Sequence, residues 1–231
     1  MVNESPILIT GIPRSGASVI AGVMNLCGAF GGDMSLHQGS YENGAIQKFV
    51  EGAYLESIGV DPMGQYPLPE EIVNLPANWK KLINTQLLAE GYTKGLWMYK
   101  SARACLLWRL WANTFPNAKW IIVRRRTGDI VESCCKTGYM TAFKDVEKQK
   151  AVNADSEEAG WLWMVHEYEK RFVEMITEGI NCKVIWPERM VNGDYQQMYE
   201  ALDWLGLTWK PQVLSFVDPL LWSSRNKERR K

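Results

Sequence analysis

Residues 6–18 read Pro-Ile-Leu-Ile-Thr-Gly-Ile-Pro-Arg-Ser-Gly-Ala-Ser, and this stretch decides the fold. The apolar run at 6–10 has the composition of a buried parallel strand. Apolar residues then recur at helical intervals between Ser15 and Gly28. The order of strand, glycine-rich loop and helix gathers backbone N–H groups and a helix N-terminus around one concave site, which suits a phosphate group.

The same alternation continues along the chain. Further strands are expected at 96–100, 119–124 and 182–186, and helices at 45–57, 79–91, 102–114, 128–137, 156–178 and 195–205. This pattern predicts an α/β fold with three layers, α/β/α, around a mostly parallel central sheet, as in P-loop NTPases. We expect one domain over 1–231, with a variable loop and helix insertion around 31–79, where prolines interrupt the chain.

Composition limits the function. Lys plus Arg and Asp plus Glu number 26 each, so no overall charge favours nucleic acid or an anionic membrane, and an anion needs a local site. The five cysteines are an odd number without C-x-x-C spacing, which argues against a disulfide framework or a zinc site. No signal peptide or run of about 20 apolar residues is visible. These features predict a soluble, cytoplasmic protein without a membrane span, and they leave the oligomeric state open.

The loop from Gly11 to Ser18 has the G-x-x-x-x-G spacing and the final hydroxyl residue of a phosphate-binding P-loop. An ordinary glycine turn would share the spacing, but the strand before it and the helix after it favour a phosphate site. ATP and GTP hydrolysis require a lysine after the second glycine. Ala17 stands there, and the only cation of the loop is Arg14. Triphosphate hydrolysis is therefore disfavoured.

A second basic segment lies at 121–133, Ile-Ile-Val-Arg-Arg-Arg-Thr-Gly-Asp-Ile-Val-Glu-Ser. Arg125 directly follows the strand expected at 119–124, and Ser133 follows eight residues later on the next helix. A guanidinium can bind a phosphate dianion in bidentate fashion, and a hydroxyl adds another donor. The alternative is a solvent-exposed strand end or a surface Arg–Glu network. For Arg124 and Arg126 a structural role is as consistent with the pattern as a ligand role.

Together these segments resemble the 5′-phosphosulfate loop and the 3′-phosphate motif of sulfotransferases that use 3′-phosphoadenosine 5′-phosphosulfate (PAPS), especially compact bacterial and phage-type members. The resemblance implies that five residues cradle the 5′-phosphosulfate: Arg14, Ser15, Gly16, Ala17 and Ser18. It also implies that Arg14 neutralises charge on the bridging oxygen as the sulfuryl group leaves. Arg125 and Ser133 would hold the 3′-phosphate, with Asp129 as the acid of the turn and Thr127 where proline is usual.

Three other segments resemble the same superfamily, so the similarity spans most of the chain in order. They are Gly-Ser-Tyr-Glu-Asn at 39–43, Lys-Ser-Ala-Arg at 100–103 and Val-Ile-Trp-Pro-Glu-Arg-Met-Val at 184–191. The C-terminal segment 225–231 is basic, and we interpret it as a solvated tail. The family's late basic loop makes Arg225 a candidate for the 3′-phosphate.

Sulfuryl transfer needs a base for the attacking group and cations for the departing phosphate. Some sulfotransferases use a histidine two residues beyond a strand-end lysine, but Ala102 occupies that position here. Glu42 is the preferred base, although it could instead be an acid that stabilises the following helix. His37 in the same loop is an alternative base. Lys100 is the candidate electrophilic partner of the leaving group, unless it is a surface lysine.

The sequence therefore predicts a PAPS-dependent sulfotransferase that produces adenosine 3′,5′-bisphosphate without a metal. Its acceptor would be a small molecule or a glycan with a hydroxyl or amine, and the sequence does not identify it. A P-loop small-molecule kinase is the alternative enzyme, based on the glycine spacing alone. A nucleotide-binding module without catalysis is the alternative outside enzymes.

Overall fold

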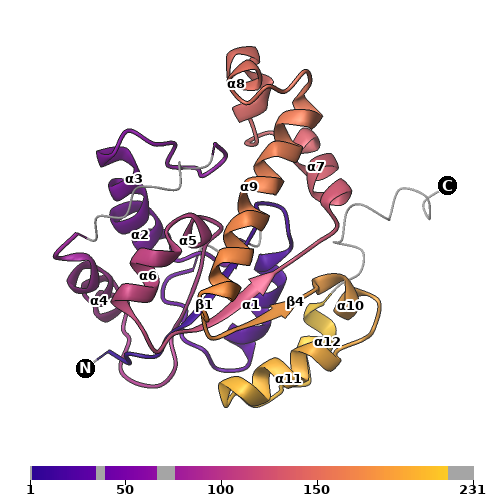
Figure 1. Ribbon diagram of the computed structural model, residues 1–231. Helices are drawn as coiled ribbons and strands as arrows, with labels where there is room; N and C mark the ends of the chain where they lie inside the picture. The colour runs from indigo at the N-terminus through magenta and orange to yellow at the C-terminus, as the bar shows by residue number, and fades with distance from the viewer. Residues whose placement is uncertain (1, 35–39, 67–75, 218–231) are drawn as a thin grey trace.

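The computed structural model describes residues 2–34, 40–66 and 76–217. A four-stranded sheet lies at its centre (Figure 1), and all neighbouring strands in it are parallel. The strands are β1 (Ile7–Gly11), β2 (Met98–Lys100), β3 (Lys119–Val123) and β4 (Cys182–Ile185), in the order β2-β1-β3-β4. All four coincide with strands expected from the sequence, each within two residues, and the mostly parallel sheet is confirmed.

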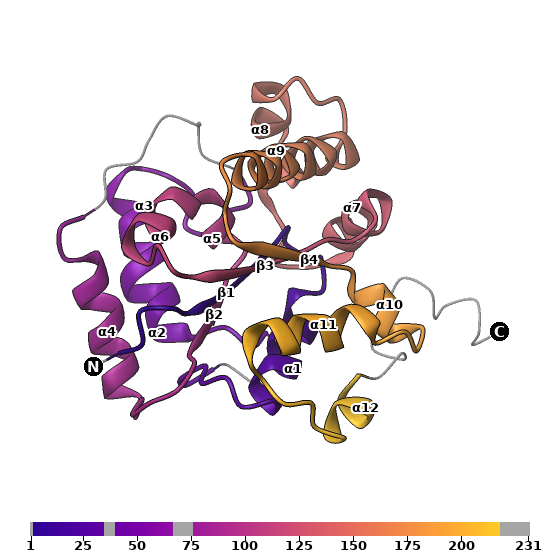
Figure 2. The ribbon, with the colours of Figure 1, turned by 60° about the horizontal axis from the view of Figure 1, so that its bottom comes forward.

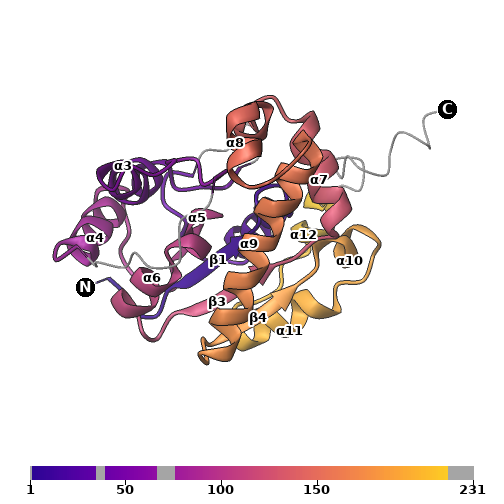
Figure 3. The ribbon, with the colours of Figure 1, turned by 45° about the horizontal axis from the view of Figure 1, so that its top comes forward.

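Helices cover both faces of the sheet, so the predicted α/β/α arrangement is confirmed (Figure 2). One face packs against α1 (Ala17–Leu26), α10 (Pro187–Val191), α11 (Gln196–Leu205) and α12 (Gln212–Phe216). The other face packs against α2 (Gly44–Ile46), η2 (Gln47–Gly52), α3 (Ala53–Ser57), α4 (Trp79–Ala89), α5 (Arg103–Leu106), α6 (Trp108–Thr114), α7 (Thr127–Lys136) and α9 (Glu157–Thr177). Helices α7 and α9 lie side by side, with η3 (Ala142–Lys144) and α8 (Val146–Ala151) connecting them (Figure 3).

Side chains of β1 point alternately to the two faces of the sheet and contribute to both hydrophobic cores. Ile7 and Ile9 enter the core on the α1 side, whereas Leu8 enters the opposite core, because successive strand residues point to opposite faces. All five residues of β1 are buried, as is typical of a central parallel strand.

Two expected helices differ from the prediction. The helix expected at 102–114 is divided at Leu107, whose φ of −109° and ψ of 22° are not helical. The break lets α5 pack on β1 and α9 while α6 brings Trp111 against Tyr99. The helix expected at 45–57 includes a π-helical stretch, η2, in which Ala53 N–H reaches back to the carbonyl of Lys48. Such stretches are common at functional sites.

The strand register brings the ends of three strands together. Gly11 lies opposite Val123, and Ile9 lies opposite Lys100. The loop after β1, the residues after β3 and Lys100 therefore emerge at one edge of the sheet. In open α/β sheets ligands bind at this carboxyl edge. Among the described helices, none combines the length and the apolar composition that crossing a membrane requires.

Candidate active site

The loop between β1 and α1 forms a tight turn. Ser15 N–H donates to the carbonyl of Ile12 at 2.9 Å. Gly16 has a φ of 90° and leads directly into α1, and Arg14 has a φ of 70°. A left-handed conformation costs a non-glycine residue about 1–3 kcal/mol, and such strain persists mainly at functional sites. The loop is therefore a tight turn that leads directly into the N-terminus of α1.

Two features of this loop fit a bound anion. A Cβ at Gly11 would lie 2.5 Å from Ser15 Oγ and 2.7 Å from the carbonyl oxygen of Val123, so a side chain there would fill the cradle. Ser15 Oγ is buried and has no hydrogen-bond partner among the described residues. Leaving a hydroxyl in that state costs about 1–3 kcal/mol. A phosphate oxygen is an acceptor that would satisfy it.

Ser18 and Lys100 meet at one backbone oxygen. Ser18 Oγ donates to the carbonyl of Ser40 at 3.0 Å, and Lys100 Nζ donates to the same oxygen at 3.1 Å. Ser18 comes from the first turn of α1 and Lys100 from the end of β2, so the structure brings two of the predicted site residues together. Their convergence shows that two donors from separate elements can act on one oxygen.

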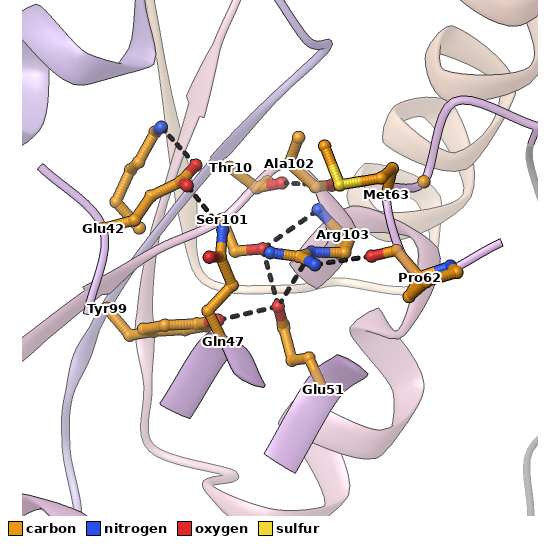
Figure 4. A network of polar contacts seen from close by, with 12 residues as sticks. Thr10, Glu42, Gln47, Glu51, Pro62, Met63, Tyr99, Ser101, Ala102 and Arg103 are labelled. Atoms are coloured by element: carbon orange, nitrogen blue, oxygen red, sulfur yellow. Dashed lines mark hydrogen bonds and ion pairs between the residues drawn. The ribbon is translucent and has the colours of Figure 1, made fainter. Parts of the chain in front are cut away.

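Glu42 and Lys100, the two candidate catalytic residues of the sequence analysis, form an ion pair. Lys100 Nζ lies 2.6 Å from Glu42 Oε1, and Gln47 Nε2 donates to Glu42 Oε2 at 2.5 Å (Figure 4). The Lys100 side chain is 10% exposed and that of Glu42 is 22% exposed, so a carboxylate and a cation meet at a site with limited access to water. Sequence analysis did not identify Gln47, because an amide in a helix carries no motif.

Arg125 is buried, so the alternative of a solvent-exposed strand end is wrong for this residue. Its Nη1 donates to the carbonyl of Arg14 at 3.0 Å, and its Nε lies 4.0 Å from Asp129 Oδ2. Burial lowers the pKa of the Arg125 guanidinium, Asp129 and Glu188 raise it, and the like charge of Arg14 lowers it again. A buried cation with a second cation beside it is an arrangement that an anion would stabilise.

Arg14 joins the two predicted phosphate motifs through its side chain. Its Nε donates to Ser133 Oγ at 2.9 Å, and its Nη1 donates to Tyr139 Oη at 3.1 Å. The guanidinium thus lies at the α7 end of the site, although the residue itself belongs to the loop after β1. Tyr139 was not predicted, since it follows α7 outside either motif.

The other two arginines of the strand end form ion pairs with acids of α9 and α10. Arg124 Nε donates to Glu169 Oε1 of α9 at 3.1 Å, and the guanidinium lies over the ring of Trp186. Arg126 Nε lies 3.6 Å from Glu188 Oε2. These contacts favour the structural role. His37, Gly39 and Arg225 fall outside the described residues.

A buried polar network supports the end of β2. Glu51 is 0% exposed, and its carboxylate accepts hydrogen bonds from Tyr99 Oη at 2.7 Å and Ser101 Oγ at 2.7 Å (Figure 4). Trp111 Nε1 donates to the same carboxylate at 3.0 Å. Arg103 Nε lies 3.6 Å from Glu51 Oε2. Burial raises the pKa of the Glu51 carboxyl, while Arg103 and the three hydrogen bonds oppose the shift. Sequence analysis missed Glu51.

Within residues 2–34, 40–66 and 76–217, no three His, Cys, Asp or Glu side chains are grouped to hold a metal ion. No protein-family model matches the chain, and no curated protein matches it by sequence. The arrangement of its elements is nevertheless shared with solved structures. The fold is that of a sulfotransferase.

The chain is similar to the sulfotransferase domain from the curacin biosynthetic pathway, with a TM-score of 0.55 and 16% identity over 92% of this chain and 77% of that chain. It is also similar to the sulfotransferase domain from the Synechococcus PCC 7002 olefin synthase, with a TM-score of 0.56 and 15% identity over 97% and 90% of the two chains. A third similar structure is a sulfotransferase from Mycobacterium tuberculosis. Its TM-score is 0.53 and its sequence identity 12%, over 94% of this chain and 71% of that chain. Likeness at these identities establishes the fold alone.

Proposed function

We propose that the protein is a sulfotransferase that moves a sulfuryl group from PAPS to a hydroxyl or amine of a small-molecule or glycan acceptor. One observation carries the proposal. The loop between β1 and α1 lacks a lysine and is hydrogen-bonded to a buried arginine that follows β3. Arg125 Nη1 donates to the carbonyl of Arg14 in this loop. The sulfotransferase fold supports it. A nucleotide with phosphates at both ends of the nucleoside would suit the two motifs.

The α7 end of the site would hold the 3′-phosphate. Arg125 and Ser133 provide a buried guanidinium and a hydroxyl, which are strong donors to a phosphate dianion. Arg14 lies beside Ser133, so a second positive charge is available there. ATP carries no phosphate at the 3′ position, so these residues would distinguish PAPS from ATP.

The β1 end of the site would hold the 5′-phosphosulfate. Gly16, Ala17 and Ser18 would supply backbone N–H groups at the N-terminus of α1, and Ser15 and Ser18 would supply two hydroxyls. The bound donor would supply an activated sulfuryl group with adenosine 3′,5′-bisphosphate as its leaving group. Ala17 in place of a lysine leaves this loop without the charge that a triphosphate requires.

Glu42 would act as the base. Its carboxylate takes the proton of the acceptor hydroxyl or amine while the acceptor atom forms a bond to sulfur. The bond between sulfur and the phosphate oxygen breaks, and its electron pair leaves with the bisphosphate. Lys100, already 2.6 Å from Glu42, would stabilise the negative charge that grows on that oxygen. The resemblance placed Arg14 at the same oxygen, but its guanidinium points to Ser133 at the α7 end of the site.

Calorimetry with adenosine 3′,5′-bisphosphate in the absence of Mg²⁺ tests the donor site. We expect Arg125→Ala to weaken binding by about 10- to 100-fold, because a charged hydrogen-bond donor to the phosphate is lost. Arg124→Ala is the matched control, since Arg124 pairs with Glu169, and it should change affinity by less than about twofold. Binding of ATP with Mg²⁺ and no preference for a 3′-phosphate would contradict the proposal.

A screen of acceptors with radiolabelled PAPS tests the transfer itself. Glu42→Gln and Lys100→Ala should each lower transfer by at least about 100-fold. Intact bisphosphate binding without transfer to any acceptor class would instead identify a nucleotide-binding module.

A further inference from the structure

We infer that Gln47 positions the proposed base by holding the Glu42 carboxylate in place while Lys100 acts on the donor. This inference rests on the proposed function. Gln47 belongs to the π-helical stretch η2 and has no role in either phosphate motif.

The Glu42 carboxylate has one partner on each oxygen. Lys100 contacts Oε1 at 2.6 Å, and the Gln47 amide contacts Oε2 at 2.5 Å. As it stabilises the leaving group, the Lys100 ammonium would be drawn toward the donor and its contact with the carboxylate would weaken. Gln47 is then the contact that keeps the flexible Glu42 side chain from rotating out of the site. Because the amide is neutral, it orients the carboxylate without adding a second positive charge beside it.

The helix that presents Gln47 is anchored to the strand that presents Lys100. Glu51, four residues after Gln47 in the same stretch, accepts hydrogen bonds from Tyr99 and Ser101, the two neighbours of Lys100. The network is fully buried at Glu51. One short helix therefore fixes the base through Gln47 and the strand end through Glu51.

The other side of Glu42 is also held. Asn43 is 2% exposed and caps α2, accepting from Ile46 N–H at 2.8 Å. Its Nδ2 donates to the carbonyl of Gly31 at 3.2 Å. The backbone of Glu42 is thus fixed by its neighbour, and Gln47 restrains the side chain at its reactive end. A preorganised base requires that its backbone and its side chain are both held in position.

Replacement of Gln47 by methionine keeps the length and helix propensity of the side chain and removes its donor. We expect kcat of Gln47→Met to fall by about tenfold or more, while KM for PAPS and the Kd for adenosine 3′,5′-bisphosphate change by less than about twofold. Gln196→Met is the matched control, because Gln196 makes the same kind of contact with Glu200, at 2.8 Å, on the exposed surface of α11. It should leave kcat unchanged.

Crystal structures of the wild type and of Gln47→Met with adenosine 3′,5′-bisphosphate provide a readout that does not depend on turnover. We expect the Glu42 carboxylate to keep its place in the wild type and to rotate away in the variant. An unmoved carboxylate, or an unchanged kcat, would overturn the inference. Absence of transfer by the wild type would overturn the proposed function instead, and the position of the carboxylate would still decide the role of Gln47.

Discussion

Gly11 lies where β1 ends, and its missing side chain lets the loop between β1 and α1 fold back against β3. A Cβ there would meet Ser15 Oγ at 2.5 Å and the Val123 carbonyl oxygen at 2.7 Å. The second contact is with the backbone at the end of an inner strand, β3, which cannot move aside without disturbing the sheet. The closeness of the loop to β3 is therefore a property of this one residue, and it also brings the Arg14 carbonyl within reach of Arg125.

Gly11→Ala should lower the free energy of unfolding by about 1–3 kcal/mol, because the added methyl group overpacks the loop. It should also weaken binding of adenosine 3′,5′-bisphosphate, since the loop must move away from β3. Urea denaturation and calorimetry measure the two effects. Gly44→Ala is the control, because a Cβ at Gly44 meets nothing within 4 Å. Equal effects of both substitutions would show that the loop tolerates a side chain.

Some residues of the candidate site could be identified from the sequence and others could not. Arg125, Lys100 and Glu42 were identified because each follows a strand or a recognisable segment. Gln47 and Tyr139 were not, because their roles arise from contacts made only after folding. Tyr139 is 125 positions from its partner Arg14. The Arg14 residue was predicted, but the direction of its side chain toward Ser133 was not.

At the scale of elements, strands were predicted more accurately than helices. Buried parallel strands are short apolar runs, and that signal is local. The break at Leu107 and the π-helical stretch η2 depend on what each segment packs against, so the apolar pattern shows neither. The short helices α10 and α12 carry too few turns for a helical period to be visible.

The network that joins η2, β2 and α6 should make the stability of the fold depend on pH. Burial raises the pKa of the Glu51 carboxyl above its usual value of 4.5, so the folded state binds a proton more tightly than the unfolded state. Stability from this group is fully present below about pH 4.5 and decreases as the pH rises through the folded-state pKa. Glu51→Gln should remove that part of the slope, and it should also destabilise the fold by leaving donors unsatisfied.

Urea unfolding at a series of pH values above 4 measures this slope for the wild type and for Glu51→Gln. The control is Glu147→Gln, since Glu147 is an exposed acid of α8 that forms an ion pair with Lys150. Parallel pH profiles for the wild type and Glu51→Gln would show that the carboxyl does not titrate differently in the two states.

At the scale of the whole molecule, the accessibility of the five cysteines to a thiol reagent measures whether the two cores open. None is in a disulfide, and Cys27, Cys105 and Cys134 are buried. Burial raises the pKa of Cys134 to about 12 and that of Cys105 further. A thiol reagent at pH 8 should therefore label at most the half-buried Cys135 and Cys182 in the native protein.

Labelling of Cys105 and Cys134 should proceed only as fast as the protein unfolds, and mass spectrometry after timed labelling measures both rates. Global unfolding in urea should expose all five thiols. Rapid labelling of Cys105 in the absence of denaturant would show that the core beneath α5 and α9 opens independently of the rest.

The carbonyl oxygen of Ser40 has a consequence for ligand selection. It already accepts from Ser18 and Lys100, so these donors are satisfied by a segment of the chain itself. An incoming anion that uses these donors must displace the Ser40 carbonyl oxygen. Its binding free energy is therefore the difference between the hydrogen bonds that it gains and those that Ser18 and Lys100 give up. A free sulfate or phosphate ion gains only one end of the site from the exchange. On the proposed function, a molecule that also reaches Arg125 would gain both ends, so we expect the donor-free protein to discriminate against free sulfate and phosphate ions.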